Sequence, residues 1–178
     1  MTIAIRDALP GDAAPIADIY NQGITDRCAT FETVLRTTAD IESRFATHDR
    51  FPTLVLEEHH RVLGWASLSA YRPRACYAGI AEFSIYLDRD ARGRRLGGPL
   101  LEALVEAARL RGYWKLVSRI FTFNHASRGL CRACGFREVG VYEKHGRLDD
   151  EWLDVVIVER LIPENLTDRR SVAATTPE

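Results

Sequence analysis

The residues best suited to hold a phosphorylated ligand form one short segment, Arg92-Gly93-Arg94-Arg95-Leu96-Gly97-Gly98. Glycines let the backbone approach an anion closely, and arginines add full positive charges. An alternating apolar and polar run, Glu82 to Leu87, precedes this segment, and a pattern of helical spacing with Pro99 in its first turn follows it. The start of a helix offers unpaired amides and a partial positive charge. The sequence therefore predicts a phosphate site at this turn, with a solvated basic turn as the alternative.

Other phosphate-binding motifs are absent. No Gly-Lys-Ser/Thr follows the turn, and no G-x-G-x-x-G is present. The chain has 178 residues, 46% of them hydrophobic, and a net charge of −1, which is typical of one globular domain with no general attraction to nucleic acid or anionic membrane. No apolar run is long enough to span a bilayer, and the first residues do not resemble a secretory signal.

The four cysteines, at positions 28, 76, 131 and 134, are scattered, which favours a reducing, cytoplasmic location. Cys131 and Cys134 have the spacing of a redox or zinc pair, but no second pair accompanies them, so packing thiols are the favoured interpretation. His59 and His60 lie in an expected turn without a third ligand nearby. We therefore expect no metal site.

Alternating strands and helices must position these residues. We expect one domain over residues 1–162 and a poorly ordered polar tail over 163–178. Hydrophobic periodicity, caps and turn residues predict the elements. The expected strands are near residues 3–8, 54–56, 62–68, 82–87, 115–121, 136–142 and 152–161, the expected helices are 13–23, 37–48, 99–110 and 124–135, and the loops are 28–35, 70–79 and 144–150.

The turn resembles the acetyl-CoA turn of the GCN5-related N-acetyltransferases, Arg/Gln-x-x-Gly-x-Gly/Ala, with Arg95 in place of the family's glycine. Within that family the chain is similar to the phosphinothricin-type acetyltransferases, and especially to arsinothricin N-acetyltransferases. The segments that carry this similarity are Ile19-Tyr20-Asn21-Gln22-Gly23-Ile24, Ala29-Thr30-Phe31-Glu32-Thr33, Gly64-Trp65-Ala66-Ser67, Ala81-Glu82-Phe83-Ser84-Ile85-Tyr86, and Arg137-Glu138-Val139-Gly140 with Lys144-His145-Gly146. The resemblance implies a mixed α/β fold with a central sheet flanked by helices, acetyl-CoA as cosubstrate and a homodimer.

The same resemblance implies which residues bind acetyl-CoA. Backbone amides of the turn would hold the pyrophosphate, and an amide of the preceding strand would face the thioester oxygen, if splay or a bulge frees it from pairing. Asn124 would contact the pantetheine arm, or cap the helix that follows it, or do both. Cys131 stands where many relatives have a tyrosine acid, and we assign it no catalytic role. The implied binding residues are Ser84, Ile85, Tyr86, Leu87, Arg92, Gly93, Arg94, Arg95, Leu96, Gly97, Gly98 and Asn124.

Two side chains are candidates for proton transfer. A free α-amine is mostly protonated at pH 7, so an acetyl acceptor needs a base. Glu82 shares one strand face with Ser84 and Tyr86 and matches the proposed base of the relatives; an exposed strand carboxylate is the alternative. His145, on the expected loop, is the second candidate, because an imidazole can relay a proton near neutral pH, unless it is a surface histidine.

The expected substrate residues are Arg72 and Arg74, because guanidinium groups bind oxyanions bidentately and the matching loop of the relatives contacts substrate. Phe31 would line the pocket, by resemblance. The leading hypothesis is acetylation of the α-amine of a toxic glutamate-like amino acid: arsinothricin first, phosphinothricin second, methionine sulfone or sulfoximine third. The alternatives are a protein N-terminus or polyamine as acceptor, a non-catalytic acyl-CoA-binding module, and a nucleotide-binding protein.

Overall fold

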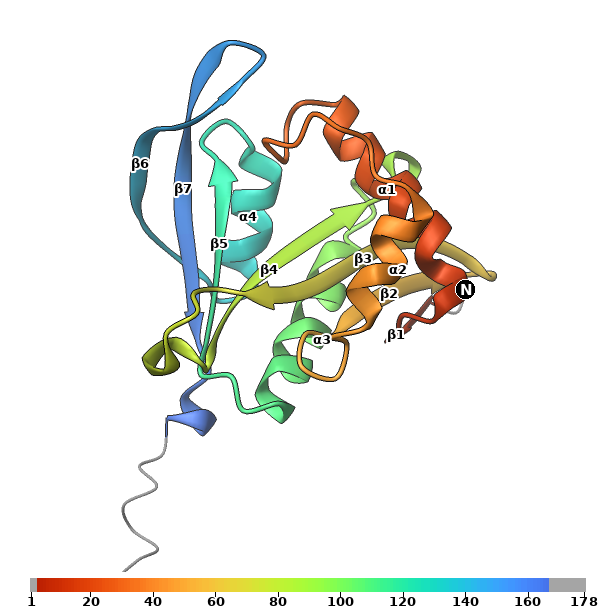
Figure 1. Ribbon diagram of the computed structural model, residues 1–178, viewed down its shortest axis with the longest axis horizontal. Helices are drawn as coiled ribbons and strands as arrows, with labels where there is room; N and C mark the ends of the chain where they lie inside the picture. The colour runs from red at the N-terminus through yellow and green to blue at the C-terminus, as the bar shows by residue number, and fades with distance from the viewer. Residues whose placement is uncertain (1–2, 167–178) are drawn as a thin grey trace, which may run out of the picture.

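The computed structural model describes residues 3–166, and its strands form one mixed seven-stranded sheet (Figure 1). The strands are β1 (Ile3–Asp7), β2 (Thr53–Glu58), β3 (Arg61–Ala70), β4 (Ile80–Leu87), β5 (Lys115–Phe121), β6 (Arg137–Leu148) and β7 (Glu151–Leu161). They are ordered β1-β2-β3-β4-β5-β7-β6, and every neighbouring pair is antiparallel except β4 and β5. The fold class expected from the sequence is confirmed.

Helices cover both faces of this sheet. The helices are α1 (Ala13–Thr25), α2 (Thr38–Phe45), α3 (Gly97–Leu110) and α4 (His125–Ala133). α1 and α2 pack on one face, where Ile16, Ile24 and Ile41 join Val55 and Trp65 in a core. α3 and α4 cover the other face, where a larger core gathers the apolar side chains of α3 with those of β2 to β5. The sheet therefore separates two cores.

Local signals explain where several helices begin. Thr37 accepts a hydrogen bond from the amide of Asp40, and the Asp40 carboxylate accepts one from the amide of Thr37, so α2 starts with a reciprocal cap. Asn124 caps α4 by accepting from the amide of Ser127 at 3.0 Å. The apolar side chains of α3 recur at helical spacing, and Leu100, Leu101 and Leu104 are fully buried.

The parallel strands β4 and β5 pair only at their beginnings. Ile80–Glu82 pairs with Lys115–Val117, and beyond these residues the two strands diverge, as Figure 1 shows. The hydroxyl of Ser118 donates to the Phe83 carbonyl at 2.9 Å, so the backbone of Phe83 faces β5. Successive residues of a strand alternate in direction, so the amides of Ile85 and Leu87 face the same opening without a strand partner. The splay that the sequence analysis required is present.

The β6–β7 hairpin differs from expectation. Residues 144–148, predicted as a joining loop, belong to β6, and only Asp149 and Asp150 form the turn, both with positive φ. The pairing shifts register between Tyr142 and Gly146. β6 is an edge strand with most side chains exposed on both faces, so its sequence lacks the alternation that predicts strands.

Two smaller predictions also differ from the structure. α2 ends at Phe45 rather than near His48. The tail predicted to be poorly ordered from residue 163 begins with a short 3₁₀ helix, Pro163–Asn165, and the side chain of Asn165 donates to the carbonyls of Arg109 and Tyr113, both at 2.8 Å. Residues 167–178 of the predicted tail lie outside the described residues.

Candidate functional site

A cleft of about 750 Å³ opens where β4 and β5 diverge. Its floor is the freed backbone of β4, and its rim is formed by the arginine- and glycine-rich turn and the start of α4. Of the residues predicted to bind acetyl-CoA, those that line the cleft are Ser84, Ile85, Tyr86, Leu87, Arg92, Gly93, Arg95, Leu96, Gly97, Gly98 and Asn124. The cleft therefore joins unpaired strand amides to a helix N-terminus, as binding of a long phosphorylated thioester requires.

The turn keeps a backbone shape that favours glycine. Gly93 has a φ of 77°, and Arg95, which replaces the family's glycine, has a φ of 61°. A side chain in this region costs roughly 1–2 kcal/mol, so the chain retains the turn despite the substitution. Gly98 faces open space, where an added Cβ would meet no atom within 4 Å. An anion can therefore approach the backbone closely at Gly98, in the first turn of α3.

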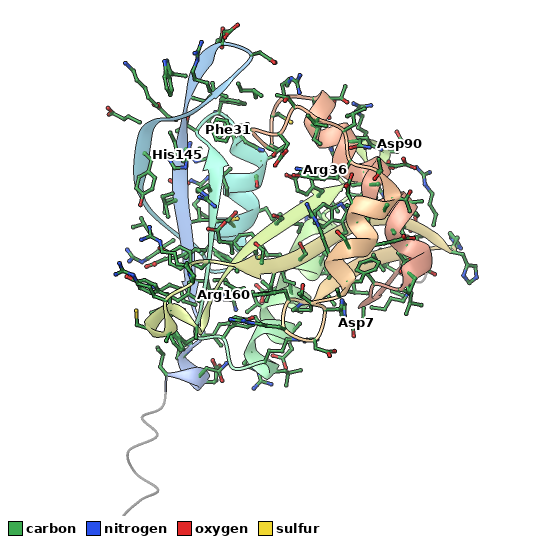
Figure 2. All side chains as sticks on the ribbon, in the orientation of Figure 1. Asp7, Phe31, Arg36, Asp90, His145 and Arg160 are labelled. Atoms are coloured by element: carbon green, nitrogen blue, oxygen red, sulfur yellow. The ribbon has the colours of Figure 1, made fainter. Side chains whose placement is uncertain are left out.

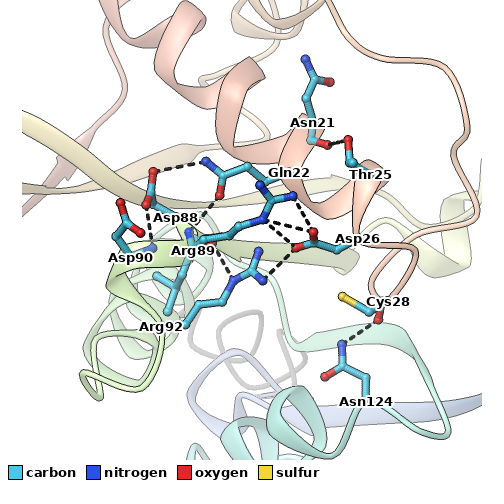
Figure 3. Close-up of polar contacts among 11 residues, drawn as sticks. Asn21, Gln22, Thr25, Asp26, Cys28, Asp88, Arg89, Asp90, Arg92 and Asn124 are labelled. Carbon is cyan, nitrogen blue, oxygen red and sulfur yellow. Dashed lines mark hydrogen bonds and ion pairs between the residues drawn. The ribbon is translucent and has the colours of Figure 1, made fainter.

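The arginines before α3 are held by carboxylates from other elements (Figure 3). Asp26, just after α1, accepts hydrogen bonds from Arg89 and Arg92, and these guanidinium groups, Arg89 first, hold the pKa of its carboxyl below the usual range. Arg94 is the exception among the predicted residues: it does not line the cleft, because Glu58 binds its guanidinium at 2.8 Å. We therefore assign the side chain of Arg94 no contact with a ligand in this cleft.

Asn124 performs two structural tasks. Besides capping α4, its side-chain amide donates to the Cys28 carbonyl at 2.9 Å (Figure 3). This bond joins the loop after α1 to the start of α4 across one end of the cleft. Asn124 lines the cleft, so the structure is compatible with the cap and with a ligand contact.

A second cavity, of about 440 Å³, adjoins the cleft on the α1 side of the sheet. Glu82, His145 and Phe31, which the sequence analysis singled out on three distant segments, all line it. The two cavities share Phe83, Ser84, Tyr86, Ser118, Arg119, Phe121 and Ala29. A nucleophile in the second cavity could therefore meet a group bound in the cleft near Ser84 and Ser118.

Glu82 forms an ion pair with Arg119 of β5, and its side chain is only 23% exposed. The two residues face each other because β4 and β5 are parallel and Glu82 pairs with Val117, two residues before Arg119. Arg119 and Ser118 were missed by the sequence analysis. An arginine in the middle of this strand was a signal, but the residue it pairs with depends on the register of β4 and β5, which the sequence does not state.

His145 lies on the irregular part of β6, not on a loop as predicted. Its ring is 6.3 Å from that of Phe31, and Figure 2 shows both side chains on the same side of the diverging strands. Gly146 lets Phe31 pack here, because a Cβ at this position would lie 2.8 Å from the Phe31 ring. His145 and Phe31 therefore line the same cavity as Glu82.

Arg72 and Arg74 are not brought to this site. Both are exposed, and neither lines any of the three cavities described for residues 3–166. The guanidinium of Arg72 lies over the ring of its neighbour Tyr71, at 5.2 Å. Their predicted contact with substrate stays a prediction that this geometry does not favour.

Cys131 is fully buried, and desolvation raises the pKa of its thiol to about 12. All four cysteines are free thiols. Within residues 3–166 no group of three or more His, Cys, Asp and Glu side chains is placed to hold a metal ion. No helix in that range is long and apolar enough to cross a membrane.

Comparison with known proteins gives consistent matches. Residues 21–136 match the model of the acetyltransferase (GNAT) family. An L-methionine sulfoximine/L-methionine sulfone acetyltransferase from Pseudomonas aeruginosa is 35% identical over 162 residues, covering 89% of this chain and 94% of that protein. A phosphinothricin N-acetyltransferase from Alcaligenes faecalis is 31% identical, covering 88% and 81%. A solved structure that is similar to this chain is the crystal structure of a GNAT superfamily phosphinothricin acetyltransferase from Sinorhizobium meliloti in complex with AcCoA. Its sequence is 32% identical and its TM-score is 0.85; the match covers 100% of this chain and 94% of that chain.

Proposed function

The chain belongs to the acetyltransferase (GNAT) family and uses acetyl-CoA as cosubstrate, and we propose that it transfers the acetyl group to the α-amine of a glutamate-like amino acid. The observation that carries this proposal is the ion pair of Glu82 and Arg119 beside the cleft. A free amino acid carries an ammonium group and a carboxylate group. The ammonium would pair with Glu82 and the carboxylate with Arg119.

The cleft fits acetyl-CoA. The open backbone at Gly93 and Gly98 and the free amides before α3 would receive its pyrophosphate, with Arg92 and Arg95 as cations. The unpaired amides of Ile85 and Leu87 face the same opening, where they would donate to the thioester oxygen as it gains negative charge. Bound acetyl-CoA would supply the activated acetyl group. Residues of the chain would bind the amine, accept its proton and limit the access of water.

Glu82 would accept the proton that leaves the substrate ammonium, and the neutral amine would attack the thioester carbon across the shared wall of the two cavities. The new bond is an amide, the broken bond is carbon–sulfur, and the CoA thiol leaves with one proton. Phe31 and His145 would close the cavity over the amine and limit access of water. His145 would also relay the proton to solvent, as an exposed imidazole can.

The proposed physiological substrates are toxic amino acids with a tetrahedral oxo group on the side chain. The names of the similar proteins support this class, because they act on phosphinothricin and on methionine sulfoximine and sulfone. We propose arsinothricin, phosphinothricin and the methionine derivatives, in this order. Acetylation removes the positive charge of the amine, so the toxin no longer resembles an amino acid and the cell becomes resistant.

The first test is a thiol-release assay with acetyl-CoA and these amino acids, with spermidine and an alanine-initiated peptide as competing acceptors. We expect turnover of at least one of the amino acids. Arg119→Gln should raise the amino-acid KM about tenfold, since it removes a charge-assisted hydrogen bond worth roughly 1.5 kcal/mol, and leave kcat less affected. Turnover of the peptide or spermidine alone would replace the proposed substrate class, and binding of acetyl-CoA without any turnover would indicate a non-catalytic module. Tighter binding of ATP than of CoA would indicate a nucleotide-binding protein.

Cysteine labelling tests the position of acetyl-CoA without turnover. Cys28 lines the cleft and is half-buried, whereas Cys76 is exposed and lies outside it. We expect saturating acetyl-CoA to slow alkylation of Cys28 severalfold and leave that of Cys76 unchanged, as measured by mass spectrometry. The buried Cys131 should stay unlabelled in the folded protein, because its raised pKa keeps it a thiol. Equal labelling of Cys28 with and without acetyl-CoA would contradict the proposed binding mode.

A homodimer in the cytoplasm is the expected working form. Free thiols at all four cysteines support a reducing compartment. Exposed apolar side chains on β6 and β7, namely Val139, Val141, Tyr142 and Trp152, support a protein contact at this edge of the sheet. Light scattering of the purified chain measures the mass directly, and a mass of 40 kDa rather than 20.1 kDa is expected, since twice 20.1 kDa is about 40 kDa.

A further inference from the structure

A third cavity, of about 410 Å³, lies between α2 and the sheet, on the same face as Glu82. Side chains with hydroxyl groups and one arginine make up much of its lining, and no carboxylate lines it. The polar members are Tyr20, Arg44, Thr47, Thr53, Ser67, Ser69 and Ser84. Space between a helix and a sheet is normally filled by apolar side chains, so this polar lining calls for a ligand or for water.

The cavity adjoins the second cavity, which Glu82 lines. Tyr20 and Ser84 line both of them. In the pairing of β3 with β4, Ser67 lies opposite Ser84 and Ser69 lies opposite Glu82. Side chains directly opposite one another are about 5 Å apart, so a patch of hydroxyl groups leads from Glu82 into the third cavity.

Arg44 is the cation of this cavity, and within residues 3–166 it forms no ion pair with a carboxylate. Its guanidinium lies over the ring of Tyr20, 5.6 Å from the centroid. Two other arginines on this side of the molecule each pair with a carboxylate of the chain, Arg36 with Glu32 and Arg119 with Glu82, whereas Arg44 is exposed and pairs with none among the described residues. Arg44 is therefore available for an external anion.

A second donor without a partner lines the same cavity. The indole Nε1 of Trp65 is buried and forms no hydrogen bond within the described part of the chain. Buried donors without a partner are rare, because each costs roughly 1–3 kcal/mol. Arg44 and the hydroxyl groups make a set of donors in a lining without a carboxylate, and such a set suits an oxyanion.

We propose that this cavity receives the oxyanion at the end of the substrate side chain, with Arg44 as the residue that selects an anionic over a neutral side chain. The inference rests on the proposed function, which places the α-amine at Glu82 and the α-carboxylate at Arg119. Same-face positions along a strand are about 7 Å apart, so a side chain of glutamate length that starts beside Glu82 ends near Ser84. A phosphinate or arsinate would be bound there; a sulfone would fit but lack the charge.

Specificity constants of Arg44→Gln test this assignment. We expect kcat/KM for phosphinothricin to fall about tenfold, mainly through KM, because an ion pair is replaced by a neutral hydrogen bond. The value for methionine sulfone, which has no negative side chain, should stay within about twofold. Arg109→Gln is the matched control, because it removes a helical arginine from α3, on the other face of the sheet, and should change neither value. Equal losses for both substrates, or no loss, would overturn the inference.

Calorimetry separates this inference from the proposed function. Phosphinothricin is titrated into the CoA-bound wild type, Arg44→Gln and Arg74→Gln, and the binding constants are compared without any need for turnover. Binding that weakens about tenfold in Arg44→Gln supports the third cavity, even if the wild type acetylates no amino acid. If phosphinothricin binds less tightly only to Arg74→Gln, the inference is excluded. It is also excluded if the wild type does not bind phosphinothricin at all. Turnover by the wild type with no dependence on Arg44 leaves the proposed function standing and removes this inference alone.

Discussion

Replacing Glu82 by glutamine should lower kcat for the amino-acid substrate by roughly 10²–10⁴-fold, the usual contribution of a positioned base. The variant keeps the shape of the side chain and one oxygen that can accept from Arg119, but it cannot take a proton. Glu82 lines the second cavity and not the cleft proposed to bind acetyl-CoA, so the KM for acetyl-CoA should stay within about twofold. Steady-state kinetics with both substrates varied measure these effects.

The dependence on pH distinguishes a lost base from a disturbed structure. Without Glu82 the reaction relies on the small fraction of substrate that is already a neutral amine. The rate of the variant should therefore rise about tenfold per pH unit below the pKa of the substrate amine, near 8 for a reference α-amine. The thermal midpoint should match that of the wild type. A variant with unchanged kcat, or one whose loss of rate is the same at pH 6 and pH 9, would show that Glu82 serves only in its ion pair.

Elements with one buried face were predictable, because their apolar residues recur at the spacing of a strand or a helix. The alternation in β4 and the helical spacing in α3 identified both elements and the turn between them. The caps at Thr37 and Asn124 were predictable for a similar reason, since a cap involves residues only three positions apart. The strand character of residues 144–148 was not predictable, because both faces of edge strand β6 are exposed and nothing forces its side chains to alternate.

In the candidate site, too, the features that are contiguous in sequence were predictable, and those that depend on contacts between distant segments were not. The acetyl-CoA turn is contiguous in sequence, and its pattern of arginines and glycines is visible without a structure. The partner of Glu82 is not visible in the sequence, because Arg119 reaches Glu82 only through the parallel register of β4 and β5. Arg44 reaches the substrate face only through the packing of α2 on the sheet. Arg72 and Arg74 were chosen because guanidinium groups bind oxyanions and the matching loop of the relatives contacts substrate, yet their side chains line none of the cavities described for residues 3–166.

Trp65 packs against two tyrosines that line the second cavity, and Trp65→Ala should lower the free energy of unfolding by roughly 3–5 kcal/mol. The side chain is only 1% exposed. Its ring stacks on that of Tyr86, with the centroids 4.9 Å apart, and lies edge-on to that of Tyr20 at 5.6 Å, and both tyrosines line the second cavity. Truncation leaves a void that these rings cannot fill without moving. Urea denaturation followed by circular dichroism measures the loss, and Leu110→Ala, at a side chain that is 69% exposed, should cost less than about 1 kcal/mol.

Trp65→Phe separates the packing of this residue from its N–H group. Within the described residues the indole Nε1 has no partner, so phenylalanine sacrifices ring volume but no internal hydrogen bond. We expect a cost of roughly 1–2 kcal/mol, well below that of alanine. If Trp65→Phe proves as destabilising as Trp65→Ala, the N–H group is satisfied in solution, by water or by a ligand in the third cavity. If Trp65→Ala costs no more than Leu110→Ala, then Trp65 does not hold Tyr20 and Tyr86 in place, and the lining of the second cavity depends on other contacts.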